Sequence, residues 1–176
     1  MRLSVVVGNP RPRSRTLLVA EAVANRVADM TGWAIERTVD LCDYAEALFT
    51  WPDTELESIG DYIAASDLVV FASPTYKASY TGLLKAFLDR YPNNGLADIT
   101  AIPVMTGGSE AHAMAVDMTM RPLLVELGAS VPTRALFFSI SRVAEMNAVV
   151  DEWAAANLDA LPGSMRSHMR RGADGQ

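Results

Sequence analysis

Short apolar runs alternate along the chain with longer segments in which apolar residues recur every three or four positions. The runs of strand length are residues 3–7 (LSVVV), 67–72 (DLVVFA), 99–105 (ITAIPVM) and 135–140 (ALFFSI), with a weaker alternating run at 34–41. Near-continuous apolar runs are typical of strands buried on both faces of a parallel sheet. The segments with helical spacing are residues 17–30, 54–65, 81–91, 111–127 and 143–161.

A strand followed by a helix, repeated five times with short connections, predicts a doubly wound α/β sheet with right-handed crossovers and helices on both faces. The length of the chain favours the small, five-stranded type. Ligands of such sheets bind at the carboxyl ends of the strands, beside the point where the winding reverses. We therefore expect the residues that follow the first, third and fourth strands to carry the function.

The 176 residues suit a single domain with a substantial core, which we expect to span residues 1–161. The remaining residues 162–176 are basic and poor in apolar side chains, and they predict a mobile tail. Residues 42–52 (CDYAEALFTWP) form an aromatic loop longer than a usual connection, which is typical of a lid or a subunit contact.

Charge and cysteine content narrow the class of protein. The chain has 15 Lys and Arg against 21 Asp and Glu, a net charge of −6, which argues against a nucleic-acid partner. Its single cysteine, Cys42, cannot form an internal disulfide and favours a reducing compartment, with the cytoplasm as the expected location. No apolar segment approaches the ~18 residues of a membrane span, so we expect no membrane partner.

The loop after the first strand reads GNPRPRSRT. It lacks the Gly-Lys-Ser/Thr ending of a P-loop and the GxGxxG of a dinucleotide fingerprint. It offers Arg11, Ser14 and Thr16 just before a helix, whose first N–H groups and positive dipole end suit a phosphate monoester. The alternative is that Ser14 or Thr16 is an ordinary N-cap and the arginines are solvated.

The loops after the third and fourth strands indicate a flat ligand. In SPTYKASYTG, Pro74 fixes a turn and the aromatic Tyr76 stands where a planar ring would stack, although a proline turn with a packing tyrosine would look the same. In TGGSEAH, Gly107 and Gly108 permit backbone geometries that aim N–H groups at the polar edge of a heterocycle. A structural role is the alternative for His112.

Taken together, the three loops resemble those of the NADPH-dependent FMN reductase family of the flavodoxin-like fold, most closely the flavin reductases of two-component sulfonate monooxygenase systems. The segments that carry the resemblance are GNPRPRSRT, SPTYKASYTGLLKAFLD and TGGSEAHAMAVDMTMRPLLVELGA, in the family's order and spacing over most of residues 1–130. The resemblance implies strand order 2-1-3-4-5.

The resemblance also implies a set of flavin contacts. It assigns the FMN phosphate to the first loop, the isoalloxazine and ribityl to the second, and the pyrimidine edge of the ring to the third. The implied FMN-binding residues are, in that order, Arg11, Ser14 and Thr16; Pro74, Thr75, Tyr76 and Lys77; Thr106, Gly107, Gly108 and Ser109. No protein residue is implied as catalytic, because flavin N5 accepts the hydride.

The expected activity is hydride transfer from NADPH or NADH to FMN, supplying reduced flavin to a partner monooxygenase. Candidates for the 2′-phosphate of NADPH are Arg13, Arg15 and Lys77. The family forms homodimers and homotetramers through the helices after the third and fourth strands. This chain has Met118 where some relatives have an aromatic residue at a tetramer contact, which leaves open whether FMN is a substrate or a prosthetic group.

Three alternatives share the predicted fold. The first keeps FMN bound and reduces a quinone, an azo dye, a nitroaromatic or a metal oxyanion. The second is a flavodoxin-type electron carrier, although such carriers usually have a TxTGxT phosphate loop, from which GNPRPRSRT departs. The third is a flavin-free binding or structural protein in which the loops have lost their ligand.

Overall fold

The computed structural model describes residues 1–161 and contains one five-stranded parallel sheet of order β2-β1-β3-β4-β5. This is the predicted order, and the prediction of a flavodoxin-like fold is confirmed. The predicted basic tail at residues 162–176 lies outside the described residues. The strands are β1 (Arg2–Val7), β2 (Ala34–Asp40), β3 (Leu68–Pro74), β4 (Thr100–Gly107) and β5 (Leu136–Ser139).

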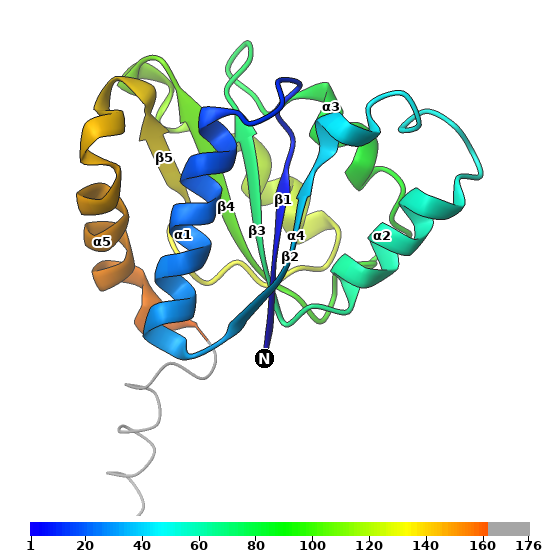
Figure 1. Ribbon diagram of the computed structural model, residues 1–176, viewed down its shortest axis with the longest axis horizontal. Coiled ribbons are helices and arrows are strands. Elements are labelled where there is room, and N and C mark those ends of the chain that lie inside the picture. Colours follow the sequence, from blue (N-terminus) through cyan, green and yellow to red (C-terminus); the bar gives the residue numbers. More distant parts are fainter. Residues whose placement is uncertain (162–176) are drawn as a thin grey trace, which may run out of the picture.

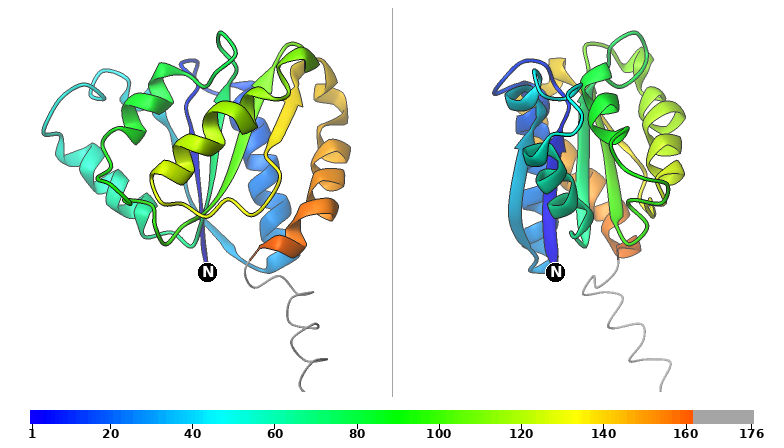
Figure 2. Two further views of the ribbon diagram at one scale, coloured as in Figure 1. Left: turned by 180° about the vertical axis from the view of Figure 1, so that it is seen from behind. Right: turned by 90° about the vertical axis from the view of Figure 1, so that its right-hand side faces the viewer.

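Helices cover both faces of the sheet (Figures 1 and 2). Within residues 1–161, no helix is both long and apolar enough to cross a membrane. The α-helices are α1 (Arg15–Thr31), α2 (Thr54–Ala64), α3 (Gly82–Leu88), α4 (Arg121–Glu126) and α5 (Met146–Asn157). Shorter helical segments are η1 (Leu41–Tyr44), η2 (Glu110–His112), η3 (Val116–Met120), η4 (Ile140–Glu145) and η5 (Leu158–Ala160).

The sheet has a separate apolar core on each face. Val19, Val23 and Val27 of α1 pack with Trp153 of α5 on one face, and the helices α2, α3 and α4 pack on the other. The view from behind in Figure 2 shows α3 and α4 lying across that second face. The three central strands are buried on both sides, whereas the edge strand β2 is largely exposed, as its alternating sequence indicates.

The prediction of one continuous helix over residues 111–127 is wrong. The segment instead contains the 3-10 turn η2, the π-helix η3 and the short α4. Pro122 lies in the first turn of α4, and a proline inside a helix removes one N–H donor and clashes with the carbonyl four residues earlier. The widened turn of η3 directly before it accommodates that ring.

Two other predicted helices are shorter than the apolar pattern indicates. The helix expected at residues 81–91 is limited to α3, and the helix expected at 143–161 is regular only in α5. Preceding α5, the η4 segment is kinked at Arg142, whose φ and ψ of −98° and 21° are not helical. Because η4 follows β5 directly, this kink keeps irregular backbone at the carboxyl edge of the sheet.

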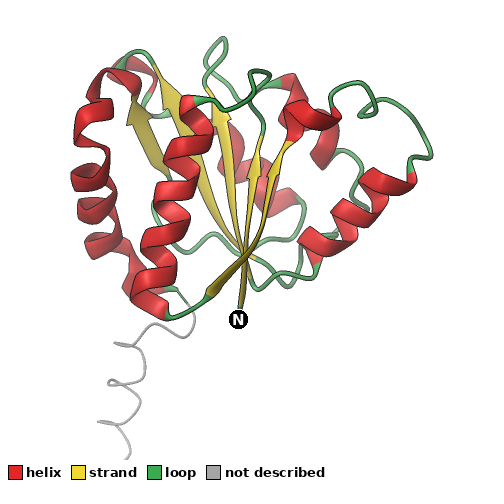
Figure 3. Ribbon diagram, in the orientation of Figure 1, coloured by secondary structure: helices red, strands yellow, loops and turns green. Residues whose placement is uncertain are grey.

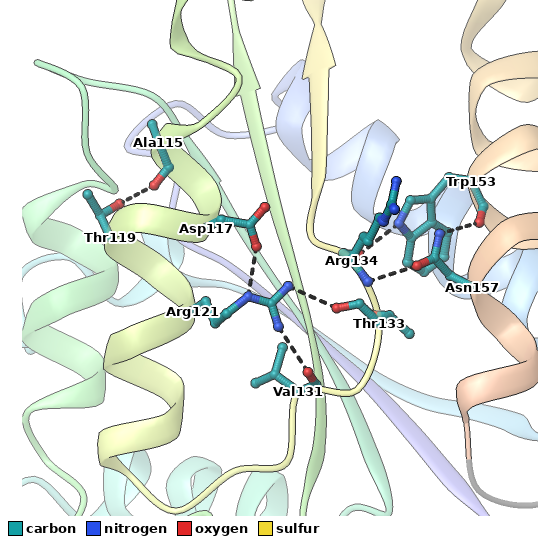
Figure 4. A network of polar contacts seen from close by, with 9 residues as sticks. All are labelled: Ala115, Asp117, Thr119, Arg121, Val131, Thr133, Arg134, Trp153 and Asn157. Atoms are coloured by element: carbon teal, nitrogen blue, oxygen red, sulfur yellow. Dashed lines mark hydrogen bonds and ion pairs between the residues drawn. The ribbon is translucent and has the colours of Figure 1, made fainter.

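Arg121 fixes the irregular helical segment to the chain that follows it (Figure 4). Its Nε donates to Asp117 Oδ1 at 2.7 Å, and its two terminal nitrogens donate to the carbonyl oxygens of Val131 and Thr133, each at 2.9 Å. Three charge-assisted bonds from one guanidinium hold η3 and α4 in place.

The start of β5 is tied to α5 by a second set of bonds in Figure 4. The backbone N–H of Arg134 donates to Asn157 Oδ1 at 2.8 Å, and Trp153 Nε1 donates to the Arg134 carbonyl at 2.9 Å. Asn157 Nδ2 donates in turn to the Trp153 carbonyl at 2.8 Å. The short edge strand β5 is therefore anchored by the helix that follows it.

Arg90 orders the long aromatic loop before α2. Its Nη1 donates to the carbonyl oxygens of Leu48 and Thr50, and its guanidinium lies 4.2 Å from the centroid of the Trp51 ring. Phe49 and Trp51 are 81% and 60% exposed, so the loop presents two aromatic rings to its surroundings. Its role as a lid or subunit contact stays a prediction.

Candidate functional site

The loops after β1, β3 and β4 gather at one edge of the sheet (Figure 3). The register explains why, since Val7 pairs with Ala72 and Pro74 pairs with Thr106 across the parallel strands. Chain segments that leave neighbouring parallel strands at the same level start side by side. The three predicted loops therefore share one end of the molecule.

The first loop ends in a helix start that favours an anion. Ser14 is the N-cap of α1, and its Oγ accepts a hydrogen bond from the backbone N–H of Leu17 at 3.1 Å. The hydroxyl hydrogen of Ser14 remains available to a ligand, and the first turn of α1 carries no acidic residue. Ser14 is thus an N-cap, as the alternative supposed, and also a potential donor to a phosphate.

A cleft of about 490 Å³ brings the first two loops together. Five of the predicted flavin-binding residues line it, together with Ile140 of η4 and the remainder of the first loop. The lining residues are Asn9, Arg11, Pro12, Arg13, Ser14, Arg15, Thr16, Pro74, Tyr76 and Ile140.

Thr16 lines the cleft, but its hydroxyl points into the protein and contacts Thr106. Its side chain is only 1% exposed, and its Oγ1 lies 2.7 Å from Thr106 Oγ1 and accepts from Asn9 Nδ2 at 2.9 Å. With its hydroxyl engaged inside the protein, Thr16 offers an anion its backbone N–H in the first turn of α1. Its assignment to the FMN phosphate stays a prediction.

The second loop contains a tight hairpin that projects beyond the strands (Figure 1). Tyr76 and Ser79 exchange two backbone hydrogen bonds, and the two residues between them, Lys77 and Ala78, have φ values of 53° and 62°. Such turns normally use Asn-Gly, because other residues are strained in the left-handed region. Tyr76 is 47% exposed, so it does not pack into the core.

The second loop is joined to the third where β3 and β4 end. The backbone N–H of Thr75 donates to the Thr106 carbonyl at 2.7 Å. The Thr75 Oγ1 is buried and has no hydrogen-bond partner among the described residues. A buried hydroxyl without a partner is costly, so Thr75 Oγ1 is free to bond a ligand or a water molecule.

The third loop is open to solvent except at its first glycine. A Cβ on Gly107 would lie 2.7 Å from the Phe137 ring, whereas nothing lies within 4 Å of that position on the exposed Gly108. Ser109 is exposed, and its Oγ caps η2 by accepting from the backbone N–H of Ala111. This loop and Lys77 do not line the cleft formed by the first two loops.

Asn9 and Ile140 line the cleft although neither was predicted as a site residue. Asn9 stands in a Gly-Asn-Pro turn, and that turn signal was the cue available for it. Ile140 lines the cleft from the end of β5, about 125 residues away along the chain, and no local pattern marks it.

The rim of the cleft is positively charged, although the chain as a whole is acidic. Its lining residues Arg11, Arg13 and Arg15 are exposed, as is Lys77 on the neighbouring hairpin, and none of the four forms an ion pair with another described residue. Local positive charge of this kind raises the local concentration of an anionic ligand and speeds its association.

Asp40 and Cys42, at and just after the end of β2, are not activated as nucleophiles. Burial raises the pKa of the Asp40 carboxyl at the end of β2. Burial, with the charge of Asp40 next, raises the pKa of the Cys42 thiol to about 11. Cys42 is therefore protonated at neutral pH and unreactive. Within residues 1–161, no group of three or more His, Cys, Asp or Glu side chains could hold a metal ion.

This architecture defines a flavodoxin-like nucleotide-binding protein, with an anion-binding helix start after the first strand and an exposed aromatic residue after the third. The model of the NADPH-dependent FMN reductase family matches residues 1–142. The chain belongs to this family, and the resemblance inferred from the three loops is confirmed.

Individual relatives agree with the family match. The chain is 32% identical over 141 residues to an FMN reductase (NADPH) of Pseudomonas putida, covering 78% of this chain and 70% of the relative. It is 30% identical over 145 residues to an NADH-dependent FMN reductase of the same species, SfnF, covering 80% and 78%. Among solved structures, the apo form of the NADH:FMN oxidoreductase EmoB superposes with a TM-score of 0.75 at 30% identity and 89% coverage of both chains.

The residues present fit FMN at both ends of the ligand. Ser14 and the start of α1 suit its phosphate, and Arg11 adds a cation that has no acidic partner among the described residues. The unpartnered Thr75 hydroxyl suits the polar atoms of the ribityl or the ring. The exposed Tyr76 supplies an aromatic wall.

Proposed function

We propose that this protein is an NAD(P)H-dependent FMN reductase whose flavin is held at the cleft between the first and second loops. The observation that carries the proposal is the capped start of α1 facing Pro74 and Tyr76 across a cleft lined by the basic first loop. One end of that cleft suits a phosphate and the other suits a planar ring. The membership of the chain in a family of FMN reductases supports this function.

The residues of the chain bind and orient the two nucleotides. Arg11, Ser14 and the first N–H groups of α1 hold the phosphate, which fixes the position of the flavin along the cleft. Tyr76 and the hairpin would flank the ring, and the third loop at Gly107 and Gly108 would offer backbone N–H groups to its pyrimidine edge. When bound, FMN supplies the electron-accepting chemistry, so no side chain has to act as an acid, a base or a nucleophile.

Two features of the protein would favour hydride transfer to the flavin. Two backbone hydrogen bonds between Tyr76 and Ser79 close the hairpin, and this ordered turn would help to position the nicotinamide beside the Tyr76 ring. The backbone N–H groups of the third loop would stabilise the negative charge that a reduced flavin carries on its pyrimidine side.

Flavin titration tests the proposed function. Added FMN should quench its own fluorescence on binding and shift its absorbance, and the protein should oxidise NADPH or NADH in an FMN-dependent reaction. Free FMN should be a better acceptor than quinones, azo dyes, nitroaromatics or metal oxyanions. A protein that binds no flavin would contradict the proposal, and a protein that turns over only one of the other acceptors would indicate the reductase with bound flavin.

Arg13 and Arg15 are proposed to recognise the 2′-phosphate of NADPH. Both are exposed on the rim of the cleft, and neither forms an ion pair with a described residue. In the double variant Arg13→Ala and Arg15→Ala, we expect the KM for NADPH to rise roughly 5- to 20-fold, while the KM for NADH changes less than twofold. Arg37→Ala, on the edge strand, is the matched control.

Steady-state kinetics with both coenzymes measure this preference. An equal rise of the two KM values would show that the arginines serve a part that NADPH and NADH share. In that outcome the exposed Lys77 becomes the remaining candidate for the 2′-phosphate.

We further propose that copies of the chain pair through the helical segment after β4. Met114, Met118 and Val125 are 72%, 67% and 54% exposed, which is unusual for large apolar side chains on one segment. A homodimer or homotetramer would cover them, and a flavin-dependent monooxygenase would receive the reduced flavin. The single Cys42 suits the reducing cytoplasm as the site of this work.

A further inference from the structure

Asn9 uses both ends of its side-chain amide to organise the first loop. Its Oδ1 accepts a hydrogen bond from the backbone N–H of Arg11 at 3.0 Å, and its Nδ2 donates to Thr16 Oγ1 at 2.9 Å. The N–H of Arg11 can only donate, so it fixes which end of the amide faces the loop. Asn9 is 7% exposed, so these bonds are largely shielded from water.

The bonds continue from the first loop into the central sheet. Thr16 Oγ1, which accepts from Asn9, lies 2.7 Å from Thr106 Oγ1 at the end of β4. Thr16 and Thr106 are 1% and 0% exposed. One buried series of bonds therefore connects the backbone of Arg11, the first turn of α1 and the end of the fourth strand.

The entrance to the loop is held separately. Thr81, the N-cap of α3, donates from its Oγ1 to the carbonyl oxygen of Gly8 at 2.5 Å. Beyond Asn9, by contrast, residues 10–13 are exposed. The hydrogen bond that the Arg11 N–H donates to Asn9 Oδ1 therefore ties the exposed part of the loop to a buried side chain. The Arg11 side chain lines the cleft at this point.

We propose that Asn9 is a positioning residue that holds Arg11 and the start of α1 ready for the flavin phosphate, and so sets the preference for FMN over riboflavin. The inference rests on the proposed function. A loop that is already ordered loses little conformational freedom when it closes on a ligand, and this improves affinity. Riboflavin has no phosphate, so its binding gains nothing from an ordered first loop.

The experiment compares the reduction of FMN and of riboflavin by the wild type and by Asn9→Ala. We expect the variant to raise the KM for FMN about tenfold, while kcat and the KM for riboflavin change less than twofold. A role in folding alone would move both flavins together. Equal changes for FMN and riboflavin would therefore overturn the inference.

Three further variants keep the result interpretable. Ser4→Ala breaks another buried hydroxyl pair, Ser4 Oγ to Ser66 Oγ at 2.8 Å near the opposite end of β1, and should leave the preference between flavins unchanged. Thr106→Val breaks the series of bonds from its far end, and Thr106→Ser keeps the hydroxyl. The valine variant should lose preference for FMN and the serine variant should keep it, which tests the inference even if Asn9→Ala does not fold.

Measurements on the wild type distinguish a failure of the proposed function from a failure of the role of Asn9. If it reduces neither flavin, the proposed function itself fails. If it reduces FMN and riboflavin with equal KM, the proposed reductase activity is supported, but the phosphate does not contribute to binding. That outcome refutes the role of Asn9.

Discussion

Replacing Gly8 with alanine should destabilise the protein by about 2–4 kcal/mol and weaken FMN binding. A Cβ at this position would lie 2.5 Å from Leu84 Cβ and 3.1 Å from its Cα. Leu84 is fully buried in α3, so neither the side chain nor the backbone can move away cheaply. The clash would push the first loop away from α3 and disturb the bond between Thr81 and the Gly8 carbonyl.

Urea and thermal unfolding measure this effect, and the melting temperature should fall by about 5–15 °C. Gly82→Ala is the control, because nothing lies within 4 Å of its added Cβ and it is the first residue of the same helix. This control should be neutral or slightly stabilising, since alanine favours a helix over glycine. A Gly8→Ala variant as stable as Gly82→Ala would show that α3 and the loop can separate without cost.

The double variant Arg11→Ala and Ser14→Ala should raise the KM for FMN by at least about 100-fold. Each group is expected to contribute a charge-assisted hydrogen bond to the phosphate, at about 1.5–3 kcal/mol per bond. Activity with riboflavin, which lacks the phosphate, should stay within a few-fold of the wild type. The measurement is steady-state turnover with both flavins, supported by fluorescence titration of FMN.

Loss of the Ser14 cap also costs stability, about 1 kcal/mol, and the control must reproduce it. Asp53 caps α2 in the same way, since its Oδ1 accepts from the N–H of Leu56 at 2.9 Å. Asp53→Ala combined with Arg37→Ala therefore removes one cap and one cation away from the cleft. If that control raises the KM for FMN as much as the site variant does, the first loop is not the phosphate site.

The apolar pattern is a sound guide to the elements but a poor guide to their ends. Four apolar runs and one weaker alternating run predicted the five strands, because burial on both faces of a parallel sheet requires continuous apolar sequence. The helix ends depend on individual residues instead. Thr81 caps α3 where the pattern already indicates a helix, and Pro122 interrupts the predicted segment 111–127 although its apolar spacing continues.

For the candidate site, too, the sequence predicts the location and the residue types better than the contacts. The position of the three loops follows from the order of strands and helices, and the residue types in those loops indicate phosphate and ring binding. The contacts that these residues make with one another cannot be predicted from the sequence. Thr16 was predicted to contact the FMN phosphate, and in the folded protein its hydroxyl contacts Thr106, which is 90 residues away in sequence.

By itself, the sequence determined the fold class, the family and the edge of the sheet at which the loops gather, since periodicity, turn residues and loop composition act over short distances. The tertiary structure alone decided that Asn9 bonds both Arg11 and Thr16, that Ile140 lines the cleft and that the Thr75 hydroxyl has no partner among the described residues. These features depend on which side chains meet once the strands are paired. Contacts between residues far apart in the chain leave no local signal, because their geometry is set by packing.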